Sequence, residues 1–168
     1  RALWKVRAKW LVLLVWAPLP LASNREWSTQ LLAGLLLAGL LWAVIAVLLR
    51  QIPLTPALRK AWPALAALAA TQCWVVLQLA LDISVAPDFT RQNLLWGCAL
   101  VAAFVQVLLL VDSRERVLLT ARVMVLCGVF QAFFAGIMMM SDIEQIAWLE
   151  KVFARNRATG TFGNPNHL

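Results

Sequence analysis

Five long apolar runs dominate this sequence and restrict the folds that it can adopt. Short polar or charged segments separate each run from the next, and 62% of all residues are hydrophobic, against about 45–50% in soluble domains. Inside a bilayer every backbone N–H and C=O must be paired within the protein, so runs of this kind cross as α-helices. We therefore predict an all-α, polytopic membrane helix bundle, with residues 1–168 as a single transmembrane domain. The five expected spans are about 10–22, 31–49, 61–81, 94–111 and 118–140.

The first apolar run follows a basic leader that carries four cations between Arg1 and Lys9. Signal peptides and first transmembrane helices share this arrangement. Pro18 and Pro20 stand where a signal peptide needs a small-residue cleavage site, so they favour a span. Under either alternative the segment that follows lies outside.

Charges in the connecting segments predict the orientation of the spans. Cytoplasmic loops are enriched in Lys and Arg. With a cytoplasmic N-terminus, the inside segments hold ten of the fifteen basic residues, and six of the eight acidic residues lie outside. The formal charge of +7 thus reflects orientation in a membrane and does not indicate a nucleic-acid partner.

Small and polar residues within the spans predict helix–helix contacts. Gly34 and Ala38 have the small-xxx-small spacing that lets helices approach closely. Arg122 is near enough to a span end to snorkel to the surface, and no Asp, Glu, Lys or His lies deep in a span, which disfavours ion-coupled transport. Four glutamines are expected to form interhelical hydrogen bonds: Gln72, Gln78, Gln106 and Gln131.

The segment 142–153 after the fifth span is imperfectly amphipathic. Ile143, Ile146 and Phe153 share a broad face that Glu150 interrupts. We predict an interfacial helix on the outer leaflet, with a partner-docking helix as the alternative. The chain shows no metal-ligand spacing, and its three cysteines, Cys73, Cys98 and Cys127, all fall in apolar runs, where they indicate no disulfide framework.

The polar segment 155–168 carries the strongest candidate for a binding site. Arg155 and Arg157 precede a glycine-bearing turn, and Asn164 and Pro165 fit the N-cap and first position of a new helix. Guanidinium groups and a helix N-terminus both favour phosphate oxygens. The alternative is that both arginines contact lipid headgroups or balance nearby acids.

The sequence begins at Arg1, without a methionine, and ends four residues into this expected helix. We therefore expect it to be part of a larger membrane protein that holds the rest of the site. His167, the only histidine, could act as a general base. Without an identified partner, a structural or interfacial role is the simpler interpretation.

Two stretches carry a resemblance to a known family. Residues 157–168, Arg-Ala-Thr-Gly-Thr-Phe-Gly-Asn-Pro-Asn-His-Leu, resemble the motif that opens the shared domain of the bacterial O-antigen ligase and O-antigen polymerase superfamily, in which an arginine precedes Gly-x-Phe-x-Asn-Pro-Asn. Residues 18–27 resemble the Pro-Leu-Pro…Ser-Asn-Arg-x-Trp stretch that follows the first span in many members. The expected number of spans lies between them, and the resemblance covers this chain as the N-terminal part of such a protein.

The resemblance implies an integral membrane glycosyltransferase of the bacterial inner (cytoplasmic) membrane. It would transfer a glycan from undecaprenyl diphosphate to lipid A–core, a polysaccharide or a protein at the periplasmic face. The implied partners are the lipid-diphosphate-linked glycan, its acceptor and membrane lipids, and no metal or other cofactor is implied.

The resemblance also implies roles for individual residues. Arg157 matches the motif arginine and is the expected diphosphate contact, and Arg155 and Arg25 are further substrate-binding candidates. The family's catalytic histidine lies in a large later loop with no counterpart here, so no catalytic residue is assigned and His167 does not inherit that role. Five residues match the part of the motif that shapes its turn: Gly160, Phe162, Asn164, Pro165 and Asn166.

Two other classes of protein stay open at this stage. One is a membrane scaffold in which the terminal arginines only hold lipid. The other is a flippase or transporter for the same lipid carrier, which would need charged residues in further spans. Ligase, polymerase and protein-glycosylating activities are not distinguished.

Overall fold

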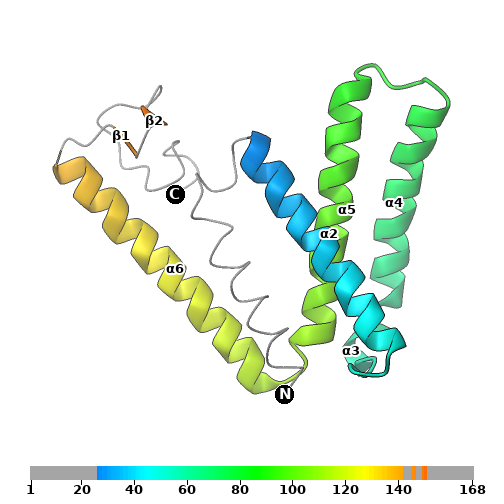
Figure 1. Ribbon diagram of the computed structural model, residues 1–168, viewed down its shortest axis with the longest axis horizontal. Helices are drawn as coiled ribbons and strands as arrows, with labels where there is room; N and C mark the ends of the chain where they lie inside the picture. Colours follow the sequence, from blue (N-terminus) through cyan, green and yellow to red (C-terminus); the bar gives the residue numbers. More distant parts are fainter. Residues whose placement is uncertain (1–25, 142–144, 147–148, 151–168) are drawn as a thin grey trace.

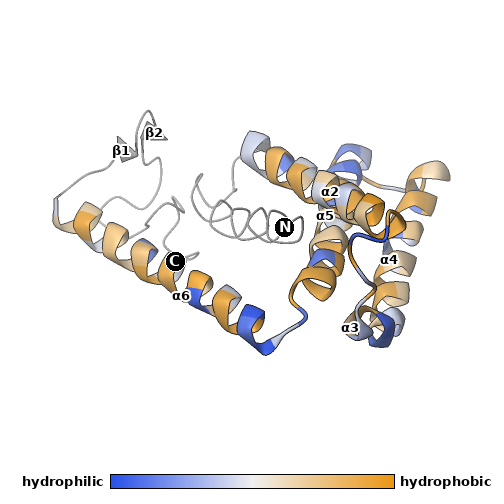
Figure 2. Cartoon of the chain, turned by 60° about the horizontal axis from the view of Figure 1, so that its bottom comes forward, coloured by the Kyte–Doolittle hydropathy of each residue, from blue (hydrophilic) through white to orange (hydrophobic). Residues whose placement is uncertain are grey.

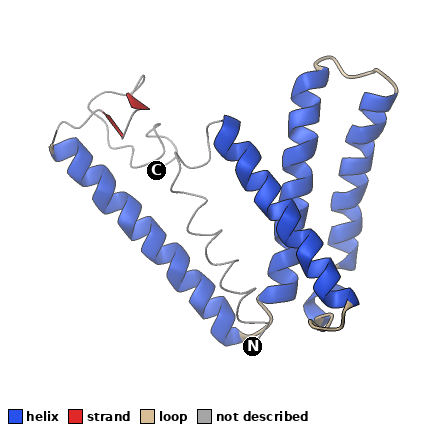
Figure 3. Ribbon diagram, viewed as in Figure 1, coloured by secondary structure: helices blue, strands red, loops and turns tan. Residues whose placement is uncertain are grey.

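The computed structural model describes residues 26–141, 145–146 and 149–150, and the described part is almost entirely α-helical (Figures 1 and 3). Four of its helices are long and apolar enough to cross a membrane. The expected all-α membrane helix bundle is thus confirmed, and the chain is a multi-pass membrane protein. The expected first span, 10–22, lies outside the described residues. The helices are α2 (Glu26–Leu48), α3 (Pro56–Lys60), α4 (Trp62–Ala80), α5 (Pro87–Leu110) and α6 (Arg114–Met140).

Three of the four spans begin earlier than the hydropathy pattern predicts, α5 by the largest margin. α5 was expected from residue 94 but starts at Pro87, because a proline at the first helical position and Asp88 in the first turn both suit a helix N-terminus. α2 starts at Glu26, five residues before the apolar run. α4 and α6 follow the expected 61–81 and 118–140 more closely, although α6 includes an additional charged first turn.

α3 lies within the segment 50–60, which was expected to be a loop. Thr55 caps it by accepting a hydrogen bond from the Leu58 N–H at 3.2 Å, and Pro56 occupies its first position. The Thr55 hydroxyl also donates to the Leu108 carbonyl of α5 at 2.7 Å. This pair of bonds fixes the short helix against the end of α5.

The expected interfacial helix over 142–153 is wrong at the residues that the structure describes. Gln145–Ile146 (β1) and Leu149–Glu150 (β2) form an antiparallel pair in which Ile146 faces Leu149. The chain must reverse between these two strands, which a continuous helix does not allow. The predicted helical face was already interrupted by Glu150.

α5 is the central helix of the bundle, because α2, α3 and α4 all pack against it. The α2–α5 seam repeats at intervals of three and four residues, as in coiled-coil-like helix packing. Around this bundle the helix surfaces are apolar (Figure 2), as hydrocarbon requires. On α2 the buried residues of the seam include Leu32, Leu36, Ala43 and Ala46, and on α5 they include Ala99, Ala102, Gln106 and Leu109.

α6 is set apart from the α2–α4–α5 group in Figure 1 and makes no extended contact with another described helix. Three of its residues are buried at spacings of four and three: Gln131, Ala135 and Met138. The turn before it is fixed at Ser113, which caps the helix, and at Arg116, which pairs with Asp112. Arg116 also donates to the Leu110 carbonyl at 3.4 Å.

The small residues that mediate close packing on α2 differ from those that the sequence suggested. Gly34 and Ala38 are exposed, and a Cβ built on Gly34 would meet nothing within 4 Å. Gly39 and Ala43, at the same spacing, lie on the face toward α5, where a Cβ on Gly39 would come within 2.5 Å of the Gln106 Oε1 atom. The sequence predicted close packing through small residues on this helix, but it selected Gly34 and Ala38, which lie on a face that does not contact α5.

Substituting Gly39 with Leu should therefore destabilise the bundle by about 1–3 kcal/mol, because the larger side chain overpacks the seam. Gly34→Leu, on the same helix, should change stability by less than ~0.5 kcal/mol, since its side chain would enter open space. Unfolding in mixed detergent micelles, followed by tryptophan fluorescence, measures both. Equal effects of the two substitutions would contradict the packing described here.

Candidate functional site

The residues expected to bind substrate lie outside the part of the chain that the structure describes. Their roles, and that of His167, therefore stay predictions based on the sequence alone. This applies to Arg25, Arg155 and Arg157, and to the motif residues Gly160, Phe162, Asn164, Pro165 and Asn166.

The polar groups that the structure does describe within the bundle centre on Gln106. Its side chain is 3% exposed, and its Nε2 donates to the Leu36 carbonyl of α2 at 2.8 Å and to the Ala102 carbonyl of α5 at 3.1 Å. Gly39 makes room for this amide, because a side chain there would collide with it. The predicted interhelical hydrogen bond is thus confirmed for Gln106.

A second glutamine uses a glycine of the neighbouring helix in the same way. A Cβ on Gly97 of α5 would come within 2.8 Å of the Nε2 atom of Gln72, which projects from α4. The Gln72 amide donates to the Thr71 hydroxyl of its own helix at 3.4 Å. The glutamines could be recognised in the sequence, but their glycine partners were missed. The presence of a glycine in the span that each glutamine faces, Gly39 for Gln106 and Gly97 for Gln72, was the feature that could have revealed them.

The two remaining glutamines differ in their surroundings. Gln131 is 4% exposed on α6 and takes part in a polar interaction. Gln78 is half-buried on α4. The four glutamines are spread over three helices, α4, α5 and α6, and form no common cluster around one another in the contacts described. Their geometry is that of helix-packing groups, and it does not assemble a reactive centre.

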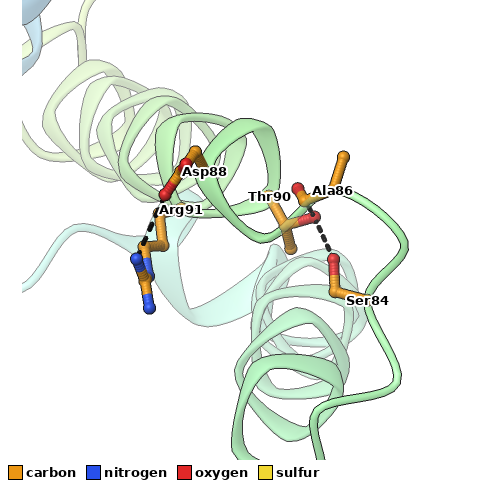
Figure 4. Close-up of polar contacts among 5 residues, drawn as sticks. All are labelled: Ser84, Ala86, Asp88, Thr90 and Arg91. Atoms are coloured by element: carbon orange, nitrogen blue, oxygen red, sulfur yellow. Dashed lines mark hydrogen bonds and ion pairs between the residues drawn. The ribbon is translucent and has the colours of Figure 1, made fainter.

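The loop between α4 and α5 is organised by short-range polar contacts (Figure 4). The Ser84 and Thr90 hydroxyls lie 2.7 Å apart, and the Thr90 hydroxyl also donates to the Ala86 carbonyl at 3.1 Å. Arg91 pairs with Asp88 at 3.1 Å, and both side chains are largely exposed. A solvent-exposed pair of this kind contributes little to stability, and Arg91 is the only cation near this end of the bundle among the described residues.

Cations gather at one end of the described bundle. The α4–α5 loop end carries Asp82, Asp88 and Arg91, whereas the end formed by α3 and the α5–α6 turn carries most of the described cations, together with Asp112 and Glu115. Both α2 and α4 finish with a left-handed residue, Arg50 (φ 55°) and Asp82 (φ 52°). Each stands where glycine usually ends a helix, and each bears the charge typical of its own end.

Groupings suited to metal binding are not found among the described residues: no three His, Cys, Asp or Glu side chains come together there. Cys73, Cys98 and Cys127 are free thiols. No chemistry of the described helices therefore depends on a thiol pair.

No protein-family model, curated protein or solved structure matches this chain. What the protein does must be inferred from its own residues. The described helices supply a membrane-spanning framework with separated charges, and the residues that could bind a substrate come from the sequence patterns on either side of it.

Replacing Gln106 with Leu should lower bundle stability by roughly 0.6–2 kcal/mol, the range for interhelical hydrogen bonds in membranes. Gln78→Leu provides the matched control, because the Gln78 side chain makes no hydrogen bond to another described residue. Detergent-induced unfolding of both variants checks this. If Gln78→Leu lowered the stability as much as Gln106→Leu, the Gln106 hydrogen bond would have no specific effect on stability, which would contradict the prediction.

Proposed function

We propose that this chain is the N-terminal portion of an integral membrane glycosyltransferase of the O-antigen ligase type. The reaction would transfer a glycan from undecaprenyl diphosphate to lipid A–core, a polysaccharide or a protein at the periplasmic face. The observation that carries the proposal is the Arg157 motif, Arg-x-x-Gly-x-Phe-x-Asn-Pro-Asn, which follows a run of apolar spans. The membrane helix bundle is consistent with a lipid-linked substrate, since both reacting partners must meet at a bilayer surface.

Arg157 has the chemistry that a diphosphate leaving group needs. As the acceptor hydroxyl oxygen bonds to the anomeric carbon, the bond from that carbon to the diphosphate oxygen breaks and negative charge grows on the departing diphosphate. A fixed guanidinium can bind two of its oxygens at once and stabilise that charge. Arg155 and Arg25 are further cations for the same task. The proton of the acceptor hydroxyl would pass to a general base outside these 168 residues.

The charge distribution supports an orientation for this reaction. Under the positive-inside rule, the end with α3 and the α5–α6 turn faces the cytoplasm, and the α4–α5 loop faces the periplasm. With the expected first span included, the N-terminus is cytoplasmic and residues 155–168 follow α6 on the periplasmic side. The protein would then be an inner-membrane enzyme with its diphosphate contacts on the side where the acceptor is found.

Neither alternative class gains support from a specific observation. A carrier flippase is expected to place charged groups deep in its spans, whereas Arg122 is the only charged side chain well inside a described span. A non-catalytic scaffold would need no phosphate-binding arginines. The transfer assay described below distinguishes both alternatives from the proposed glycosyltransferase.

Orientation can be tested by cysteine labelling in a background where the three native cysteines are replaced by alanine. Val85→Cys is fully exposed in the α4–α5 loop and should react with a membrane-impermeant maleimide in cells whose outer membrane alone is permeable. Gln51→Cys, exposed at the opposite end, should react only after the inner membrane is opened. The reverse pattern would invert the proposed topology.

Transfer by the full-length protein, reconstituted with a lipid-diphosphate-linked glycan and candidate acceptors, tests the function. Arg157→Ala should lower the rate by about 100-fold or more, the scale of losing one charge-stabilising group in a transition state. Arg157→Lys should restore little, because an ammonium cannot reproduce the two-pronged contact. Product is scored by a mobility shift on gels.

Arg91→Ala is the matched control, since it removes an arginine from the same side of the membrane but outside the motif. Normal transfer by the Arg157→Ala variant would exclude this residue from the site. Absence of transfer by the folded wild-type protein to every acceptor would favour a scaffold or a carrier flippase, which transport assays with the same lipid then distinguish.

A further inference from the structure

The basic end of the bundle carries a set of cations without protein partners. Arg50, Arg59, Lys60, Arg114 and Arg122, here called the basic rim, are all exposed, and none of their side chains makes a hydrogen bond or ion pair with another described residue. Arg116, by contrast, is occupied by Asp112 and by the Leu110 carbonyl. The rim is therefore available to a ligand that the described chain does not itself supply.

The fold gathers these residues from three separate elements. Arg50 follows the end of α2, Arg59 and Lys60 close α3, and Arg114 and Arg122 belong to α6. The Thr55–Leu108 hydrogen bond holds the α3 region against the end of α5, and α6 begins just beyond that end. In Figure 1 α3, the end of α2 and the start of α6 accordingly lie at the same end of the molecule.

Apolar side chains surround the cations and indicate the kind of ligand. Trp62, two residues after Lys60 in the chain, is 67% exposed, and Leu54 is 49% exposed. On α6, Arg122 is flanked by the exposed side chains of Leu118 and Leu126. A ligand for such a surface must present negative charge above hydrocarbon, which is the chemistry of an anionic phospholipid. A soluble polyanion would not cover the apolar part.

Depth along α6 adds a second argument for lipid. Arg122 is eight residues after Arg114, or about 12 Å further along the helix axis. The backbone of Arg122 thus lies below the level of the lipid headgroups, where an unpaired charge is costly. The long side chain can extend back toward the surface and bind a lipid phosphate there. Leu118, one turn nearer the surface, leaves an apolar path alongside which an acyl chain can lie.

The local backbone also places charge at this surface. Arg50 occupies a left-handed position (φ 55°) that closes α2, with its N–H bonded to the Val47 carbonyl at 2.9 Å and the Gln51 N–H bonded to the Ala46 carbonyl at 2.8 Å. Glycine fits this position with less strain. The exposed arginine instead places a cation two residues after the last residue of α2.

We propose that the basic rim is a binding surface for anionic phospholipid headgroups, with α3 at the level of the phosphates and Arg122 binding one lipid at the edge of α6. This surface lies at the end opposite to the proposed transfer chemistry and does not depend on that function. It would order phosphatidylglycerol or cardiolipin around the bundle. Each cation near an anionic surface contributes about fivefold to such an association at moderate salt.

Spin-labelled lipids provide the test. The full-length protein is reconstituted in phosphatidylcholine bilayers containing a trace of spin-labelled phosphatidylglycerol or phosphatidylcholine, and the motionally restricted fraction of each is measured. Wild type should bind the phosphatidylglycerol at least about fivefold more strongly, and added salt should weaken the preference at the exposed cations. Because both leaflets carry label, the result does not depend on the orientation in the vesicle.

Three variants make the test specific. Arg59→Gln/Lys60→Gln/Arg122→Gln should lose most of the preference, Arg59→Lys/Arg122→Lys should keep it, and Arg91→Gln, which removes one cation from the other end, should leave it unchanged. Helicity by circular dichroism monitors the fold; if the triple variant does not reconstitute, Arg122→Gln alone should still lower the preference by about half or more. Equal binding of both lipids to wild type, or an unchanged preference in the neutralised variants, would overturn the proposal.

Discussion

The absence of a hydrophobic driving force between helices in a bilayer is the constraint on which this bundle depends. Lipid tails solvate an apolar side chain as well as another helix does, so association must come from close packing and from polar contacts. The α2–α5 seam supplies both at one place. Gly39 and Ala43 allow the backbones to approach, and Gln106 bridges the gap that Gly39 leaves by donating to the Leu36 carbonyl. α3 and α4 also pack against α5.

The connecting segments then determine how the ends of the helices are arranged. Thr55 is both the cap of α3 and a donor to α5, so a single side chain ties a surface helix to the membrane bundle. Ser113 and Arg116 perform a similar task at the start of α6. Because these ties lie at one end, they gather cations that are far apart in the sequence onto one surface. The opposite end holds the acidic Asp82 and Asp88.

The proposed glycan transfer and the proposed phospholipid binding take place at opposite ends of this framework. Each involves phosphate groups, but in a different way. At one end, a guanidinium would stabilise a diphosphate as it leaves an anomeric carbon, which demands fixed geometry and exclusion of water. At the other end, cations would hold lipid phosphates that remain intact, which demands only charge and a neighbouring apolar surface. The first proposal rests on the motif around Arg157, and the second rests on exposed side chains of the described fold.

The sequence by itself determined the approximate position of the four long apolar helices that the structure describes, because burial of backbone polar groups in hydrocarbon leaves few other structures for such runs. It also identified Gln106 as an interhelical donor, and the Arg157 motif is visible only there. It misplaced the starts of α2 and α5, since helix caps extend beyond the hydrophobic core, and it predicted a helix where β1 and β2 pair.

Only the tertiary structure decided which face of each helix is in contact. Gly34–Ala38 and Gly39–Ala43 are equivalent by spacing, and their roles differ because α5 lies against one of them and not the other. The same holds for the basic rim, whose cations come from two predicted loops and one predicted span and share one end of the molecule only because α3 packs against α5 where α6 begins. Hydropathy is a property of each residue alone, so it predicts which segments are helices in the membrane. It does not predict these contacts, because they depend on how two helices are rotated relative to one another.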